Sequence, residues 1–169
     1  MLRDEKVIEN FVTSDFHLFD RAVGWILQNN LLTGNRFCEF GAGFGVCTML
    51  AALHGMESIG VEIESSLTEH ASELAETLEN DAKFYCGSFV PSGLDRDLLV
   101  DGDANNADTD DDGIYDLIGL DVDDFDLIFA FPWPAEYSYF EAIFDESAAD
   151  GALLLTYRGR EGMHLLRKV

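Results

Sequence analysis

A short glycine-rich turn between an apolar strand and a helix constrains the fold of this chain more than any other feature. The sequence Phe-Cys-Glu-Phe-Gly-Ala-Gly-Phe-Gly-Val fills residues 37–46, with a glycine at every second position after an acid. Glycine lacks a Cβ atom, so Gly41, Gly43 and Gly45 allow a sharp turn and a close approach to a ligand at the amino end of the next helix. The segment predicts the first strand, turn and helix of a β-α-β unit.

A second acid ends the next apolar strand. Glu62 closes the segment Ser-Ile-Gly-Val-Glu at residues 58–62. It lies about 20 residues beyond Gly41, the separation at which a carboxylate in a β-α-β unit reaches ribose hydroxyls. Glu39 precedes the same turn by two residues, so two carboxylates bracket it. The pattern predicts a site for a nucleoside-containing cofactor.

The spacing within the turn indicates which cofactor this is. Dinucleotide-binding turns follow G-x-G-x-x-G and present backbone N–H groups to a pyrophosphate, which a neighbouring carboxylate would repel. Here the pattern is E-x-G-x-G-x-G, which places Glu39 poorly for a phosphate and well for a cation. The amino acid end of S-adenosylmethionine carries an ammonium and a sulfonium. With these residues the chain resembles a class I S-adenosylmethionine-dependent methyltransferase, from about Phe11 to Tyr157.

The resemblance implies roles for individual residues. In similar methyltransferases the acid that matches Glu39 contacts the methionine end of the cofactor, and the acid that matches Glu62 binds the ribose diol. The other cofactor-binding residues that we expect are the turn glycines, the residue after Glu62, the loop after the third strand and the segment before the first helix: Gly41, Gly43, Gly45, Ile63, Gly87, Ser88, Phe89, Thr13 and Ser14.

Two of these groups have alternative interpretations. Ser88 replaces the acid that is more usual in the family, and its hydroxyl is expected to bind the adenine amine while Phe89 stacks on the base. The alternative is an ordinary loop with a buried Phe. Thr13 and Ser14 are expected beside the methionine moiety, and the alternative is that they only cap a helix.

Hydrophobic periodicity predicts alternating strands and helices. We expect helices over residues 14–29, 44–54, 65–78 and 134–146, and strands over residues 36–40, 58–63, 83–86, 125–131 and 152–156. In the third helix, Ser66 and Glu69 are predicted to form a capping box, and Leu67, Leu74 and Leu78 to form the apolar stripe. The alternation predicts a three-layer α/β fold with a doubly wound, mostly parallel sheet, the Rossmann-like methyltransferase fold.

Twelve residues follow Tyr157. They have room for one strand at residues 164–168, so we expect the closing antiparallel hairpin of this fold to be reduced. An uncovered sheet edge invites pairing with another chain. The sequence therefore leaves a homodimer open.

An acidic segment interrupts the alternation within what we expect to be a single domain over residues 1–169. Residues of about 92–124 carry too little apolar surface to order themselves and predict a surface insertion. Within it, Asp108, Asp110, Asp112 and Asp116 have the spacing of a calcium loop, but the twelfth position is Gly119 and not a bidentate Glu. A solvated acidic loop is the stronger interpretation, and a calcium site the weaker one.

The charge of the chain constrains its partners. The net charge is −23, with 10 Lys and Arg against 33 Asp and Glu. Proteins that bind nucleic acids need a basic footprint, so DNA and RNA are not expected as partners. A basic protein or a saline habitat would suit this charge.

The segment Ala-Phe-Pro-Trp-Pro, which begins at Ala130, indicates an acceptor site. Amino-methylating enzymes of nucleic acids carry an Asp or Asn before Pro-Pro-aromatic at this place, and that polar residue is missing here. We expect Phe131, Trp133 and Tyr137 to form an apolar cage near the methyl group, with Glu136 at its rim to attract a cationic amine. Core packing is the alternative for Phe131.

The remaining features predict a cytoplasmic protein without membrane association. The three cysteines lack C-x-x-C spacing and are expected to be free thiols in a reducing compartment. The first residues are too charged for a secretory signal, and no apolar run is long enough to span a bilayer.

These observations predict a methyltransferase that passes a methyl group to its acceptor by direct displacement and yields S-adenosylhomocysteine. The acceptor is expected to be a protein lysine or a small molecule. No catalytic residue is assigned, because displacement from an activated cofactor needs alignment more than acid-base groups. The alternative is a non-catalytic S-adenosylmethionine-binding module whose acidic insertion recruits a basic partner or calcium. A nicotinamide oxidoreductase would require a different turn.

Overall fold

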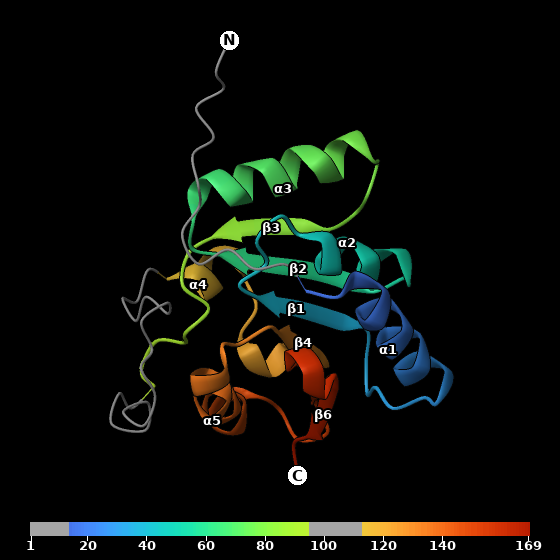
Figure 1. Cartoon of the computed structure of the whole chain (residues 1–169). Helices are drawn as coiled ribbons and strands as arrows, with labels where there is room; N and C mark the ends of the chain where they lie inside the picture. The colour runs from blue at the N-terminus through green and yellow to red at the C-terminus, as the bar shows by residue number, and fades with distance from the viewer. Residues whose placement is uncertain (1–13, 95–112) are drawn as a thin grey trace.

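The computed structural model describes residues 14–94 and 113–169 and contains one six-stranded sheet in the order β3-β2-β1-β4-β5-β6 (Figure 1). The first five strands are parallel and the last is antiparallel to its neighbour. Their bounds are β1 Arg36–Phe40, β2 Glu57–Glu62, β3 Lys83–Cys86, β4 Leu127–Ala130, β5 Leu153–Tyr157 and β6 Met163–Arg167. The predicted doubly wound, mostly parallel α/β sheet is confirmed.

Helices cover both faces of the sheet and make three layers. Their bounds are α1 Phe16–Gln28, α2 Val46–Leu53, α3 Ser65–Thr77, α4 Ile114–Ile118 and α5 Tyr137–Ser147. Successive strand residues point to opposite faces, so Phe37 of β1 packs in the core beneath α1 and α2 while Cys38 packs in the core beneath α4 and α5. β4 is buried along its whole length, as its continuous apolar sequence predicts for a central parallel strand.

The strand order places the predicted site at a switch point. β1 lies between β2 and β4, and its Phe40 is paired with Ala130 of β4. In Figure 1 the arrowheads of β1, β2 and β3 point to the same side of the molecule. Ligands of doubly wound sheets bind beyond these carboxyl ends, where the strand order reverses. Gly41, Glu62 and Gly87 lie at this edge.

The beginning of α1 differs from the prediction. The side chain of Asp15 caps the helix by accepting a hydrogen bond of 2.9 Å from the backbone N–H of Leu18. Ser14 is therefore not the cap, and Thr13 lies outside the described residues. The capping interpretation of Ser14 is wrong, because an Asp one residue later meets the free N–H groups of the first turn.

The predicted capping box of α3 is wrong, and its predicted apolar stripe is correct only at Leu67. Glu64 precedes the helix, and Ser66 donates its hydroxyl to the Glu64 carboxylate in place of a capping box with Glu69. Leu74 and Leu78 are 39% and 61% exposed. The buried side chains, four residues apart along the helix, are Leu67, Ala71 and Ala75. Small residues were not recognised as the packing stripe because their hydrophobicity is low.

The second end of the acidic segment of about 92–124 forms a helix and a turn. α4 buries Ile114 and Tyr115, and a 3-10 turn over Val122–Asp124 buries Val122. These residues pack in the core of the α5 face. The part after Gly113 therefore belongs to the fold and is not a surface insertion. Asp108, Asp110 and Asp112 of the predicted calcium loop lie outside the described residues, and Asp116 is in α4.

The last helix and strand start at slightly different places from those predicted. A 3-10 turn over Pro134–Glu136 precedes α5, so the helix proper begins at Tyr137. A single strand, β6, follows β5. It begins at Met163 and runs antiparallel to β5, as expected for the reduced closing hairpin. Within the described part of the chain, no helix has both the length and the apolar character needed to cross a membrane.

Candidate functional site

Gly41 and Gly45 of the turn have different structural roles. Gly41, Gly43 and Gly45 all have positive φ, at 75°, 56° and 76°. A Cβ on Gly45 would lie 2.3 Å from the ring of Phe84, so this glycine is needed for packing. A Cβ on Gly41 would meet nothing within 4 Å, and Gly41 is exposed. The turn therefore packs against the protein at Gly45 and is open at Gly41, where a ligand can approach.

Glu62 holds the turn in place with both of its carboxylate oxygens. Oε2 accepts a hydrogen bond of 2.8 Å from the backbone N–H of Gly43, and Oε1 accepts one of 3.0 Å from the N–H of Glu64. The side chain is largely buried, at 9% exposure. A carboxylate oxygen can accept more than one hydrogen bond. Both oxygens of Glu62 therefore retain capacity for a hydroxyl donor such as a ribose diol.

This arrangement is unfavourable for a pyrophosphate. The N–H of Gly43 is the kind of group that a dinucleotide-binding turn presents to phosphate oxygens. Here it is occupied by the Glu62 carboxylate. A phosphate at the turn would lose that donor and would also face the negative charge.

Glu39 is buried at the end of β1, on the other side of the turn. Its Oε2 accepts hydrogen bonds from the backbone N–H of Thr48 at 2.9 Å and from the Thr48 hydroxyl at 2.6 Å. Burial raises the pKa of Glu39 to about 8, and the charge of Glu62 raises it further while the bonds from Thr48 lower it. A cation placed beside Glu39 would favour its ionised form.

Ser14 supplies an unsatisfied polar atom near this carboxyl group. Its Oγ is buried without a hydrogen-bond partner among nitrogen and oxygen atoms of the residues that the structure describes, although the Cys47 thiol is within its reach. Cys47 in turn lies close enough to Glu39 for the carboxylate to raise the pKa of the thiol. Buried polar groups are rarely left unsatisfied. The polar end of a ligand beside Glu39 would provide the missing partner.

The loop after β3 lies against the end of β2. The N–H of Gly87 donates a hydrogen bond of 2.9 Å to the Glu62 carbonyl, and Ser88 is buried, with its Oγ accepting from the N–H of Val90 at 3.3 Å. Next to Glu62, the apolar side chain of Ile63 is 43% exposed. An exposed apolar side chain at this place offers a surface on which a flat base can pack.

Phe89 is held by other aromatic rings. Its ring stacks on Phe40 with centroids 4.8 Å apart and on Phe140 with centroids 5.2 Å apart. The ring therefore has a packing role in the core beneath α5, which was the alternative interpretation from the sequence. A role in stacking on adenine stays a prediction.

The residues predicted for the acceptor cage have different surroundings in the structure. The ring of Phe131 packs on Tyr157 of β5, with centroids 4.8 Å apart, and Trp133 is 41% exposed. Glu136 is buried, not at a rim: its Oε2 accepts from the Trp133 N–H at 3.3 Å, and burial raises its pKa. Glu136 is therefore a weaker acid than an exposed carboxyl group at a rim would be.

Arg158, which the sequence did not single out, lies against the predicted cage. Its guanidinium carbon is 4.5 Å from the ring centroid of Tyr137. Its Nη2 donates to the Glu141 carboxylate at 2.5 Å, and its Nε to the Thr156 hydroxyl at 3.3 Å. One face of Tyr137, which was predicted as part of an apolar cage, therefore carries a cation of the chain. The signal in the sequence was an Arg directly after the predicted fifth strand.

Tyr139 was also missed, because it was assigned to the apolar stripe of α5. Its hydroxyl is buried without a hydrogen-bond partner in the described part of the chain. Burial raises its pKa to about 12, with a further contribution from the charge of Glu136. A buried hydroxyl without a partner is unusual in a core helix.

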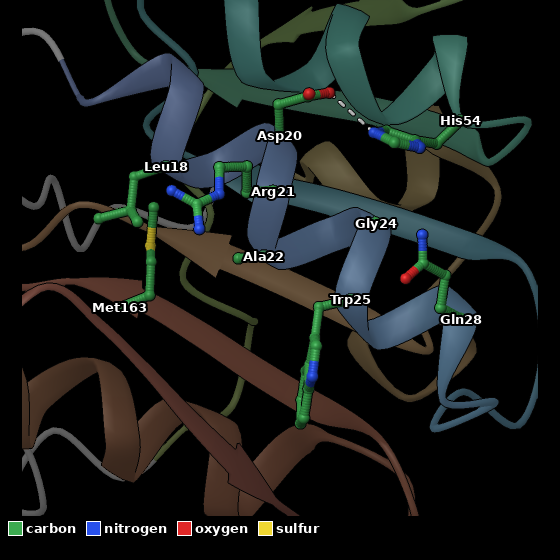
Figure 2. Close-up of a pocket in the computed structure, with 9 residues that line it drawn as sticks. All are labelled: Leu18, Asp20, Arg21, Ala22, Gly24, Trp25, Gln28, His54 and Met163. Carbon is green, nitrogen blue, oxygen red and sulfur yellow. Dashed lines mark hydrogen bonds and ion pairs between the residues drawn. The ribbon is translucent and has the colours of Figure 1, made fainter.

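A separate hollow lies beside α1. Figure 2 shows the hydrogen bond between Asp20 and His54, 2.8 Å long, which joins α1 to the end of α2. The hollow is lined by residues of α1, His54 and Met163: Leu18, Asp20, Arg21, Ala22, Gly24, Trp25, Gln28, His54 and Met163. None of these belongs to the predicted site, so the hollow is not assigned to the cofactor.

Over residues 14–94 and 113–169, no three His, Cys, Asp or Glu side chains are grouped so that they could hold a metal ion. The calcium hypothesis for residues 108–116 stays a prediction.

Several solved structures with a similar fold are methyltransferases. An RNA methyltransferase from Salinibacter ruber in complex with S-adenosyl-L-homocysteine is similar with a TM-score of 0.60 and 17% identity, over 93% of this chain and 92% of that one. Magnesium protoporphyrin IX methyltransferase from Synechocystis PCC 6803 with bound S-adenosylmethionine has a TM-score of 0.54 and 16% identity, over 87% of this chain and 60% of that one. An S-adenosylmethionine-dependent methyltransferase from Clostridium acetobutylicum ATCC 824 has a TM-score of 0.54 and 13% identity, over 85% of this chain and 50% of that one.

Sequence comparison adds nothing to this likeness. No protein-family model matches the chain, and no curated protein matches it. The chain spans about half the length of the Clostridium enzyme but nearly the whole of the Salinibacter one. At these identities the likeness shows the fold, that of a Rossmann-like methyltransferase.

Proposed function

We propose that the protein binds S-adenosylmethionine at the carboxyl ends of β1 and β2 and transfers its methyl group to an acceptor beside β4 and β5. The observation that carries the proposal is the pair of acids around the turn. Glu62 occupies the N–H of Gly43, which disfavours a pyrophosphate, and buried Glu39 suits a cationic ligand. Among the nucleoside cofactors considered, S-adenosylmethionine combines a ribose with a cationic amino acid end.

Each side of the site would hold one part of the cofactor. Glu62 would accept hydrogen bonds from the ribose hydroxyls, because its oxygens keep free acceptor capacity. Glu39 and the buried hydroxyl of Ser14 would bind the amino acid end. Exposed Ile63 would pack on the adenine, with Ser88 beside it.

The chain would contribute to the reaction mainly by alignment. The bound cofactor supplies a methyl group that is already activated by its positively charged sulfur. The walls around Gly41 and Phe131 would bring the acceptor atom into line with that methyl group and would exclude water. This account explains why the turn and its two acids are so well defined while no nucleophile, base and orienting group converge at the described site.

The acceptor is assigned from this chain and not from its structural neighbours. The neighbours named above act on chemically unrelated acceptors, RNA and a magnesium porphyrin. Here Ala130 is buried and offers no polar group where base-methylating enzymes carry Asp or Asn. We favour a small molecule or a protein side chain over a nucleic acid base.

A methyl-transfer assay tests the proposal. The protein is incubated with S-adenosylmethionine labelled in its methyl group and with pools of small acids, small amines and proteins, and labelled products are separated by chromatography. Transfer to one pool supports the enzyme. Cofactor binding without transfer to any pool supports the alternative, a non-catalytic binding module that recruits a partner.

A further inference from the structure

Arg158 and Arg160 lie at the carboxyl edge of the sheet, beside the predicted acceptor segment. β4 and β5 are paired through Ala130 and Thr156, so the chain that follows β5 runs next to Phe131. The contact of 4.8 Å between the rings of Phe131 and Tyr157 confirms this closeness. A tight turn over Gly159–Glu161 then leads into β6 and leaves Arg160 exposed.

The guanidinium of Arg158 is fixed in one orientation but is not saturated. Its side chain is 15% exposed and is held by the Tyr137 ring, the Glu141 carboxylate and the Thr156 hydroxyl. A guanidinium has five N–H donors, and these bonds use the one on Nε and one of the two on Nη2. The two on Nη1 have no partner among the described residues. A planar, preoriented guanidinium with free donors is well suited to a carboxylate or a phosphate.

The charges around Arg158 also favour an anion. Glu141 is already paired with Arg158, and burial raises the pKa of Glu136, which disfavours its negative charge. Where the chain leaves β5 it carries two bases, Arg158 and Arg160, and one acid, Glu161, although the net charge of the protein is −23. These two arginines therefore depart locally from the acidity of the protein.

We infer that the methyl acceptor carries an anionic group, a carboxylate or a phosphate, that binds to Arg158 and Arg160. The inference rests on the proposed function and names its acceptor class. The rings of Phe131, Tyr137 and Tyr157 would pack on the body of the acceptor. A cationic amine, which the sequence alone suggested, would instead meet the guanidinium on the face of Tyr137 and be repelled.

Binding of three matched aromatic probes tests the inference without a known acceptor. Benzoate, phenyl phosphate and benzylamine share a ring and differ in charge. Each is titrated into the full chain, with and without S-adenosylhomocysteine, while the Nε–H signals of the arginines are followed by NMR; the signal absent from Arg158→Gln identifies Arg158. We expect one or both anions to shift this signal and to bind at least about tenfold more tightly than benzylamine. The stronger of the two anions distinguishes a carboxylate from a phosphate acceptor.

Variants separate binding from folding. Arg158→Gln should weaken anion binding by about tenfold or more, and Arg160→Gln by less, because Arg160 is exposed. Arg36→Gln is the matched control, since Arg36 is also paired with carboxylates, Glu57 and Asp124, but lies at the opposite edge of the sheet. If Arg158→Gln leaves Glu141 unpaired and unfolds the chain, the double variant Arg158→Gln/Glu141→Gln removes both charges, and it should still bind anions poorly.

Three results would overturn the inference: tighter binding of benzylamine, anion binding unchanged by the loss of Arg158, or no binding of either anion. These results are independent of the cofactor. If S-adenosylhomocysteine does not bind, the proposed function fails while the response of Arg158 to the anions is still measured. If it binds and the anions do not, only the acceptor class is wrong.

Discussion

The carboxylate of Glu62 and the backbone N–H of Gly43 are joined by a hydrogen bond of 2.8 Å that fastens the end of β2 to the turn after β1. The same carboxylate accepts from the N–H of Glu64, so one side chain fixes two backbone segments. A turn held in this way is ordered before a ligand arrives. Preorganisation of this kind reduces the entropy lost on binding.

Cofactor binding should release a proton at neutral pH. The pKa of Glu39 is about 8, so the free protein holds this carboxyl mostly protonated at pH 7, whereas a bound cation favours the carboxylate. Affinity should therefore rise with pH up to about 8 and then level off. Calorimetry at pH 7 in buffers of different ionisation enthalpy should report release of about one proton for each S-adenosylmethionine bound.

Glu39→Gln is the control for this proton, because it keeps the size of the side chain and cannot ionise. Binding of S-adenosylmethionine to this variant should release no proton from position 39, and the affinity should depend less on pH. Equal release by the variant and the wild type would mean that the proton comes from another group.

Glu39 should lower the stability of the free protein at alkaline pH. Its folded-state pKa of about 8 lies above its ordinary value of 4.5. The contribution of Glu39 to the free energy of unfolding is therefore fully present below about pH 4.5 and is lost as the pH rises through 8. The reason is that this carboxyl group ionises at a lower pH in the unfolded chain than in the folded one. At about 1.4 kcal/mol per pKa unit the loss is on the order of 5 kcal/mol as an upper bound.

Urea denaturation of the wild type and Glu39→Gln at pH 5 and pH 8.5 checks this sign. The variant should gain stability relative to the wild type, by a few kcal/mol, as the pH increases. A difference that shrinks or reverses over this range would show that Glu39 is stabilised as a carboxylate in the free protein.

Gly41→Ala should weaken cofactor binding more than it weakens the fold. Gly41 and Gly55 have φ of 75° and 86°, and a Cβ on either meets nothing within 4 Å. Alanine should cost about 1 kcal/mol of stability at each position, from the positive φ alone. Only Gly41 lies at the carboxyl edge, so Gly41→Ala should reduce affinity for S-adenosylhomocysteine by at least about tenfold, and Gly55→Ala should leave it unchanged. Equal affinities would place the cofactor away from the turn.

The three cysteines should react very differently with iodoacetamide. Cys38 and Cys47 are buried and burial raises the pKa of both thiols, whereas Cys86 is exposed. Mass spectrometry of the native protein should find modification at Cys86 alone. Its Sγ lies 3.6 Å from the carbonyl oxygen of Ile63, beside the expected adenine. S-adenosylhomocysteine should therefore slow the reaction, and an unchanged rate would argue against adenine at Ile63.

The sequence was sufficient for the parts of the fold that depend on local patterns. Apolar runs and spaced glycines located the strands and the turn, because β1 and β4 are buried almost throughout and the turn needs positive φ at fixed places. The two acids could be assigned to strand ends for the same reason. Their hydrogen bonds at Gly43, Glu64 and Thr48 depend on how separate segments meet, which spacing alone does not give.

The features that the sequence did not reveal depend on tertiary packing. Ala71 and Ala75 form the buried stripe of α3 because the helix lies close to the sheet and to α2, where a larger side chain such as Leu74 faces outward. Arg158 acquires its role only when β5 places it over Tyr137. Residues 113–124 appeared too acidic to order, yet Ile114, Tyr115 and Val122 are buried in the core and Ile118 and Leu120 pack against it.

The most direct test of the account is a calorimetric titration with S-adenosylhomocysteine of the wild type, Glu62→Gln and Glu57→Gln. Glu57 is at the opposite end of β2 and is exposed, so it controls for loss of one charge from the same strand. We expect micromolar or tighter binding by the wild type and Glu57→Gln, and a loss of roughly 10- to 100-fold in Glu62→Gln, because the amide loses charged hydrogen bonds. No binding by a folded wild type, or equal binding by both variants, would contradict the assignment of this turn to the cofactor.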